Sequence, residues 1–144
     1  MTAFDRRLML ISNLLVGGTG IAYGLIHWLG KPPDEYSLYH PWFSSAQHLH
    51  ILTAPLLVFA IGHLYHHHGI SSLKAGTEEG RRSGIALLIL AFPMIFSGYF
   101  LQLAGSDNWR IIWIGVHVAT SLVWLAGFAA HLISHARAKE LNAS

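Results

Sequence analysis

The sequence contains no cysteine, and this absence excludes several kinds of chemistry. Without cysteine there is no disulfide, no thiolate metal site, no cysteine-ligated iron–sulfur cluster and no covalent haem attachment through Cys-x-x-Cys-His. Charge is also scarce, since 11% of the 144 residues are charged, against about 25% in an ordinary soluble domain. The formal net charge is only +2 and no basic stripe is visible, so we expect no nucleic-acid partner.

Apolar residues make up 53% of the chain and gather into four long runs without Asp, Glu, Lys or Arg. Each run is close to the ~20 residues that a helix needs to cross ~30 Å of hydrocarbon. A soluble bundle would need polar outer faces, and the third and fourth runs have almost none. The sequence therefore predicts an all-α integral membrane protein, a four-helix up-down-up-down bundle in a single domain over 1–144. The predicted helices are about 8–29, 48–65, 84–103 and 111–133.

Basic residues are concentrated on one side of the predicted membrane. One side holds Lys31 and Arg110, and the other holds the remaining seven of the nine Lys and Arg residues. Cytoplasmic loops carry the excess of Lys and Arg, so we expect the N- and C-termini to be cytoplasmic. The first apolar run is long for a secretory signal, so we expect it to remain as a membrane span. The seven are Arg6, Arg7, Lys74, Arg81, Arg82, Arg137 and Lys139.

Eleven histidines are the unusual feature of so apolar a chain. His117 and His131 lie 14 residues apart, a spacing that returns to within ~40° of one helix face and separates the two by ~21 Å. His48 and His63 lie 15 residues apart in the second predicted helix, within ~60° of one face. Each of the two helices therefore has one imidazole near each edge of the hydrocarbon.

His50 is an alternative to His48 as the partner of His63. These two residues are 13 apart, which puts them on nearly opposite faces of a straight helix. Pro55 lies between them and can bend or locally rewind the helix, which would absorb the difference. We prefer His48 at this point, and His50 stays open.

Parallel helices place His48 level with His117 and His63 level with His131. Two facing imidazoles at each of two depths suit axial ligation of haem iron, because neutral imidazole binds iron and an apolar pocket accepts the flat macrocycle. Ionisable residues inside a membrane are functional candidates because burying them is costly. We therefore predict two haem groups that conduct electrons across the bilayer.

Glycines and one arginine accompany these histidines. Gly84 and Gly98 are 14 residues apart, so they match the two predicted levels and leave room beside a bulky macrocycle. Gly20-x-x-x-Gly24 is the GxxxG form that is typical of close helix packing. Arg110 lies at the outer mouth of the fourth helix, where it could pair with a haem propionate or anchor the interface.

This pattern of paired histidines and spaced glycines resembles the haem-binding four-helix core of cytochrome b in the bc-type quinol-oxidising complexes. The small size resembles the bacterial b561-like di-haem membrane cytochromes. The likeness extends over roughly residues 8–135 and implies a place in the bacterial inner membrane. It also implies that two haem b groups have His48, His63, His117 and His131 as axial ligands, with a quinone reacting beside one haem. Some such cytochromes take a ligand from the first helix, where this chain has His27, which could replace His48.

The chain has no room for a flavin, dinucleotide or iron–sulfur domain. We therefore expect other redox protein subunits as partners, besides membrane lipid, unless quinone serves as both donor and acceptor. Whether the chain is an enzyme by itself or an anchor subunit of a quinone-linked oxidoreductase stays open.

A second interpretation comes from histidines at the cytoplasmic helix ends. The strings His63-x-x-His66-His67 and His131-x-x-x-His135 resemble the histidine boxes of membrane desaturases and hydroxylases, which bind two non-haem irons. Imidazoles four residues apart share a helix face and could chelate a metal. Those enzymes are longer and have a third box, and this reading gives His48 and His117 no role. In the haem interpretation we favour polar caps at the interface as the role of His66, His67, His68 and His135. Contact with propionates, proton uptake for a quinone and binding of another metal stay open for them.

Overall fold

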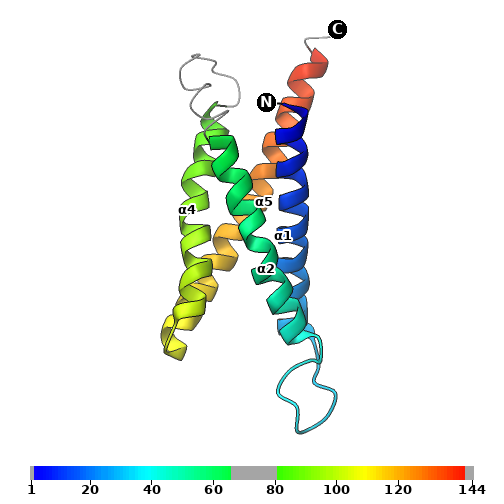
Figure 1. Ribbon diagram of the computed structural model, residues 1–144, viewed down its shortest axis with the longest axis vertical. Coiled ribbons are helices and arrows are strands. Elements are labelled where there is room, and N and C mark those ends of the chain that lie inside the picture. Colours follow the sequence, from blue (N-terminus) through cyan, green and yellow to red (C-terminus); the bar gives the residue numbers. More distant parts are fainter. Residues whose placement is uncertain (1, 66–80, 142–144) are drawn as a thin grey trace. The chain divides into compact units, whose positions relative to one another are not determined.

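All regular structure in the described part of the chain is helical (Figure 1). The computed structural model describes residues 2–65 and 81–141; for 81, 82, 135, 136 and 138–141 it describes the backbone alone. The helices are α1 (Ala3–Leu29), α2 (Phe43–Leu64), α4 (Arg81–Leu103) and α5 (Asp107–Leu141). Each contains a segment that is long and apolar enough to cross a membrane. The all-α fold with four predicted spans is therefore confirmed.

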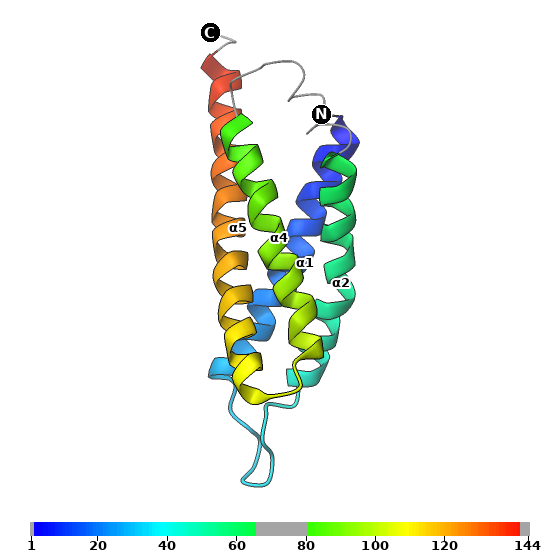
Figure 2. The same ribbon diagram turned by 90° about the vertical axis from the view of Figure 1, so that its left-hand side faces the viewer.

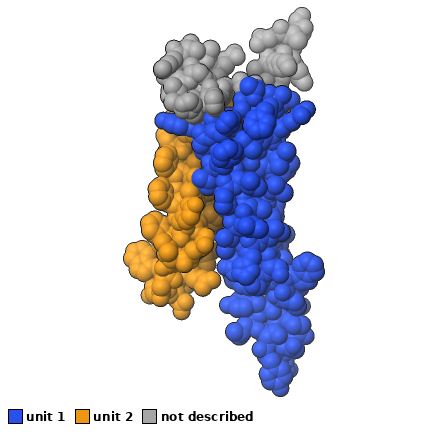
Figure 3. Space-filling view, viewed as in Figure 1, with its two compact units in different colours: residues 1–67 blue, residues 68–144 orange. Residues whose placement is uncertain are grey.

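The helices pack in pairs that are adjacent in the sequence. α1 lies against α2, and α4 lies against α5, each pair running antiparallel (Figures 1 and 2). The chain divides into two compact units, residues 1–67 and 68–144, which Figure 3 shows in blue and orange. Each unit is a helical hairpin. The single domain over 1–144 stays a prediction.

The helices extend beyond the apolar runs that predicted them. α1 begins at Ala3 instead of residue 8, because Thr2 caps it: the Thr2 hydroxyl accepts from the Asp5 amide at 3.1 Å, and the Asp5 carboxylate accepts from the Thr2 amide at 2.8 Å. α2 begins at Phe43 instead of residue 48, and α5 ends at Leu141 instead of residue 133. Apolarity marks the part of a helix that crosses hydrocarbon, whereas helical hydrogen bonding continues into polar flanks.

Large apolar side chains cover the outer faces of both hairpins. In the first hairpin Leu14 is 73% and Leu52 is 75% exposed, and in the second Ile89 is 66% exposed. Exposing such a side chain to water costs about 1.5–3 kcal/mol, a cost that lipid removes. This surface therefore agrees with contact to membrane lipid.

The segment between α1 and α2 is polar at its turn and rich in exposed rings. The Asp34 carboxylate accepts from the amides of Tyr36 at 3.0 Å and Ser37 at 2.8 Å. The Ser37 hydroxyl, together with these amides, holds the pKa of Asp34 below its usual range. Tyr36 and Leu38 are almost fully exposed, and Trp42 is exposed as well. Tyrosine and tryptophan are enriched where a membrane meets water, which is the environment predicted for this segment.

Candidate functional site

His50 of α2 lies against α1 in the first hairpin. Its Nδ1 is 3.2 Å from the Thr19 hydroxyl. The imidazole covers Gly20 so closely that a Cβ atom there would lie 2.9 Å from the His50 Cε1. Gly20, which the sequence assigned to GxxxG packing, therefore makes space for a histidine ring.

His117 of α5 has the same surroundings in the second hairpin. Its Nδ1 is 3.2 Å from the Ser97 hydroxyl and 3.0 Å from the Met94 carbonyl oxygen, both on α4. A Cβ atom at Gly98 would lie 3.1 Å from the His117 Cε1. The sequence predicted that Gly84 and Gly98 match the two histidine levels, and Gly98 lies beside the ring of His117.

Both hairpins build this arrangement from the same two short motifs. The first helix of each contributes a hydroxyl residue followed by glycine, and the second contributes a histidine followed three residues later by threonine. The pairs are Thr19-Gly20 with His50-x-x-Thr53, and Ser97-Gly98 with His117-x-x-Thr120. Each threonine hydroxyl donates to main-chain carbonyls of its own helix, including that of the histidine. The internal repeat is therefore present in the contacts as well as in the order of the helices.

These contacts determine which ring nitrogen carries hydrogen. The Met94 carbonyl oxygen can only accept, so the Nδ1 of His117 is the donor. The Thr19 hydroxyl donates to the Leu15 carbonyl at 2.8 Å, so toward His50 it accepts. In a neutral imidazole with hydrogen on Nδ1, the basic nitrogen is Nε2. Histidines that bind a metal are oriented in this way, by a hydrogen bond at the nitrogen that does not bind it.

His131 lies farther along α5 and also contacts α4 through Nδ1. That atom is 2.8 Å from the Ser83 hydroxyl. Gly84, the next residue, has no neighbouring atom within 4 Å of an added Cβ, so it does not contact the ring as Gly98 contacts His117. Of the two predicted glycines, one therefore lies against a histidine and the other has open space beside it.

Trp124 lies midway between the two histidines of α5. It is seven residues from both His117 and His131, a spacing that returns to within about 20° of the same helix face. Its side chain is only 2% exposed. The corresponding position of the first hairpin, seven residues after His50, is Leu57, which is also buried. A buried tryptophan thus lies midway along α5 between the two histidine positions.

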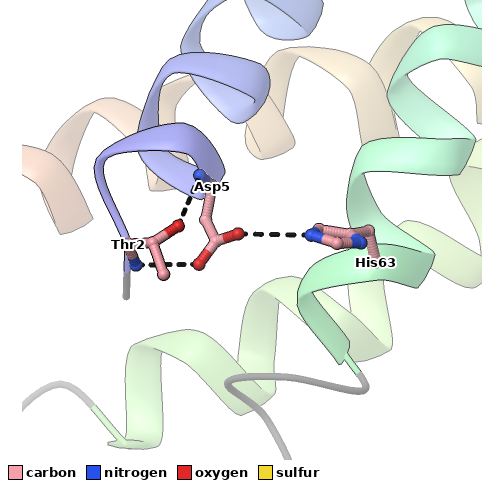
Figure 4. A network of polar contacts seen from close by, with 3 residues as sticks. All are labelled: Thr2, Asp5 and His63. Carbon is pink, nitrogen blue, oxygen red and sulfur yellow. Dashed lines mark hydrogen bonds and ion pairs between the residues drawn. The ribbon is translucent and has the colours of Figure 1, made fainter.

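His63 contacts the neighbouring helix through Nε2, whereas His50, His117 and His131 do so through Nδ1. Its Nε2 lies 3.2 Å from the Asp5 Oδ1 on α1 (Figure 4). The other carboxylate oxygen of Asp5 accepts from the Thr2 amide, so the carboxylate is held from both ends. Phe59 stacks on the His63 ring, and Phe4 meets it edge-on. Although Asp5 lies in the first turn of a helix, it is only 6% exposed.

The remaining predicted residues lie apart from these contacts. His48 is exposed on α2. His27 is exposed within a group of rings, 5.3 Å from Phe43 and 6.1 Å from Tyr23 between centroids. Arg110 is exposed in the first turns of α5, beside Trp109. His66, His67 and His68 and the side chain of His135 lie outside the described residues, as do Lys74 and the side chains of Arg81 and Arg82.

A hollow of about 160 Å³ lies where α4 turns into α5. Half of its lining residues are aromatic, and Phe100 stacks on Trp113 with 4.6 Å between centroids. Trp109, the residue before Arg110, also contributes to the wall. The hollow is open to the outside and holds no titratable side chain, so its lining favours apolar groups.

Sequence reasoning missed the residues that orient the histidines. They are Asp5, Thr19, Gly20, Ser83, Met94 and Ser97. A signal for four of them was present, because Asp5 and Thr19 are 14 residues apart, and so are Ser83 and Ser97. These spacings equal that of His117 and His131, and the repeated His-x-x-Thr motif pointed to His50 instead of His48.

Within residues 2–65 and 81–141, no group of three or more His, Asp or Glu side chains is arranged to hold a metal ion. A haem iron needs only two side chains, since the porphyrin supplies the other ligands. Comparison with known proteins found no family model, curated protein or solved structure that matches this chain.

Proposed function

We propose that this chain is a di-haem b-type membrane cytochrome that carries electrons across the bilayer. The observation that supports it most is the repeated histidine, held at Nδ1 and lying on glycine, in each of two hairpins. A hydrogen bond at Nδ1 orients the imidazole so that Nε2 can bind a metal. Glycine beside the ring leaves room for a flat macrocycle. One such histidine from each hairpin would together supply the two imidazoles that bis-imidazole ligation of one iron requires.

The donor set fits haem at three positions and departs from it at the fourth. His50 and His117 would be the axial ligands of the outer haem, and His131 and His63 those of the inner haem. We take His50 in place of the initially preferred His48, because the Nδ1 of His50 contacts a hydroxyl beside a glycine as that of His117 does, and His48 is exposed. At His63 the nitrogen that iron normally takes faces Asp5, so this ring has to turn before it can serve as a ligand.

The chain's own residues would orient and insulate, while the iron supplies one-electron chemistry. The hydroxyls of Thr19, Ser97 and Ser83 fix the imidazole planes, and the apolar helix faces exclude water. Trp124, which is buried midway between His117 and His131, would lie between the two levels. Arg110 could pair with a propionate at the outer level. Other redox subunits, or a quinone, would deliver and accept the electrons at the two membrane faces.

The first test is the colour of the purified protein. Expressed with adequate haem supply in a bacterial membrane, the chain is expected to give a b-type spectrum that sharpens on reduction, with two haem groups per chain by pyridine haemochrome analysis. Metal analysis of the same sample should find iron in the same amount as haem. A colourless preparation, or non-haem iron without porphyrin as in the histidine-box interpretation, would contradict the proposal.

We also propose that both termini are cytoplasmic, as expected in the inner membrane of a bacterium. The absence of cysteine makes this testable by labelling single introduced cysteines in intact cells. A membrane-impermeant maleimide is expected to label Glu35→Cys, between α1 and α2, and to leave Ala143→Cys unlabelled until the cells are opened. The reverse pattern would show that the excess of Lys and Arg does not set the orientation here.

A further inference from the structure

The contact between Asp5 and His63 gives His63 a different hydrogen placement from that of His50 and His117. An ionised carboxylate only accepts hydrogen bonds, so the Nε2 of His63 carries hydrogen. At His117 the hydrogen is on Nδ1, because its partner is a main-chain carbonyl. His50 follows His117, since Thr19 uses its own hydrogen on Leu15. The nitrogen that would bind iron is therefore basic in two of these rings and blocked by hydrogen in His63.

Hydrogen bonds with Thr2 hold the Asp5 carboxylate in place. Asp5 is 6% exposed, and its second oxygen accepts from the Thr2 amide at 2.8 Å while the Thr2 hydroxyl accepts from the Asp5 amide. This capping box fixes the first turn of α1 and aims Oδ1 at α2 (Figure 4). Hydrogen bonds to a charged group are the strong ones, particularly where water is excluded. Ser83, which holds the equivalent ring of the second hairpin, offers only a neutral hydroxyl.

We propose that Asp5 is a latch on His63, which holds the ring in an Nε2–H form that cannot ligate iron. This inference rests on the proposed function. Asp5 competes with iron for the same nitrogen, so the inner level takes up haem more weakly than the outer level. Asp5 acts through His63 and is a positioning residue, not a ligand. Until haem displaces it, the latch joins α1 to the end of α2 and keeps the hairpin closed.

The first experiment reads the hydrogen directly and needs no haem. Full-length protein with ¹⁵N-histidine, prepared haem-free in detergent micelles, is examined by NMR that correlates ring nitrogens with ring carbon-bound protons. We expect hydrogen on Nε2 for His63 and on Nδ1 for His50 and His117, with His63→Gln assigning the signal. Hydrogen on Nδ1 of His63 would overturn the latch, whatever the protein does with haem.

The second experiment measures haem affinity in the full chain. Asp5→Ala is expected to bind the inner haem about 10-fold more tightly, because the competing charge-assisted hydrogen bond is gone. Asp5→Asn should give a smaller gain, since its amide oxygen still accepts from Nε2. Unchanged or weaker inner binding in both variants would overturn the latch.

Two controls separate the latch from a loss of structure. Thr2→Val removes the capping hydroxyl but keeps the Thr2 amide on the second oxygen of Asp5. Oδ1 should therefore stay against His63, and inner affinity should stay as in the unaltered chain. Ser83→Ala removes the matching contact of His131, which is made at Nδ1 and not at Nε2, so affinity should not rise. A gain in either control equal to that of Asp5→Ala would refute competition at His63. If the unaltered chain binds no haem, the proposed function fails, while the NMR result still decides the hydrogen placement.

Discussion

Replacing His50 by alanine is expected to remove one haem group and leave one per chain, and replacing His117 should remove the same one. The reason is that an imidazole pair is required on each iron, and these two histidines have matching surroundings in their hairpins. Haemochrome stoichiometry gives the loss, and redox titration shows which of two spectral components disappears. The double variant His50→Ala/His117→Ala should lose no more haem than either single variant.

His48→Ala is the matched control for this experiment. The side chain lies two residues from His50 on the same helix but is exposed, so both haem groups should remain. Loss of a haem in His48→Ala together with its retention in His50→Ala would reverse our assignment and restore the preference drawn from spacing alone. Loss of the inner component in His117→Ala would show that the two levels are paired differently.

Gly20→Ala is expected to weaken binding of the outer haem by about 10-fold or more, the usual cost of disturbing the contacts that orient a metal-binding histidine. A Cβ atom at this position would lie 2.9 Å from the His50 ring, closer than atoms tolerate, so the imidazole has to move off Thr19. Gly98→Ala should act in the same direction but less strongly, because its Cβ would lie 3.1 Å from His117. Haem titration of the purified variants measures both effects.

Gly18→Ala and Gly115→Ala are the controls for the two glycine variants. Nothing lies within 4 Å of a Cβ at either position. All four variants gain up to about 1 kcal/mol of helix propensity. A difference in haem affinity between Gly20→Ala and Gly18→Ala, or between Gly98→Ala and Gly115→Ala, therefore isolates the effect of the contact with histidine. Equal haem affinity in Gly20→Ala and Gly18→Ala would mean that the His50 ring is not held against α1 when haem is bound.

Much of the fold could be predicted from the sequence because membrane spans are selected by a simple property. A run of about 20 apolar residues has few alternatives to a helix across the bilayer, since lipid offers no partner for main-chain polar groups. The four helices therefore follow from composition. Their ends do not, because Thr2 and Asp5 begin α1 with a hydrogen-bonded cap that apolarity cannot reveal.

The candidate site could be predicted only in part. Spacing along a helix shows which residues share a face, but it does not show which residues of a neighbouring helix that face contacts. His117, His131 and Gly98 followed from intervals of 14 residues. The choice between His48 and His50 did not, because Pro55 lies inside the second helix and a proline can bend a helix, which changes the angle between residues on its two sides. Contact with Thr19 and Gly20 on α1 separates the two candidates.

By itself the sequence determined four apolar helices, the absence of thiol chemistry and the spacing of the histidines along two of those helices. Only the tertiary structure decided which imidazoles are held against a neighbouring helix and by which nitrogen. The physical reason is that a ring's hydrogen placement depends on its partner, and the partners lie far away in the chain. Thr19 is 31 residues from His50, and Asp5 is 58 residues from His63, so packing of the helices has to bring each pair together.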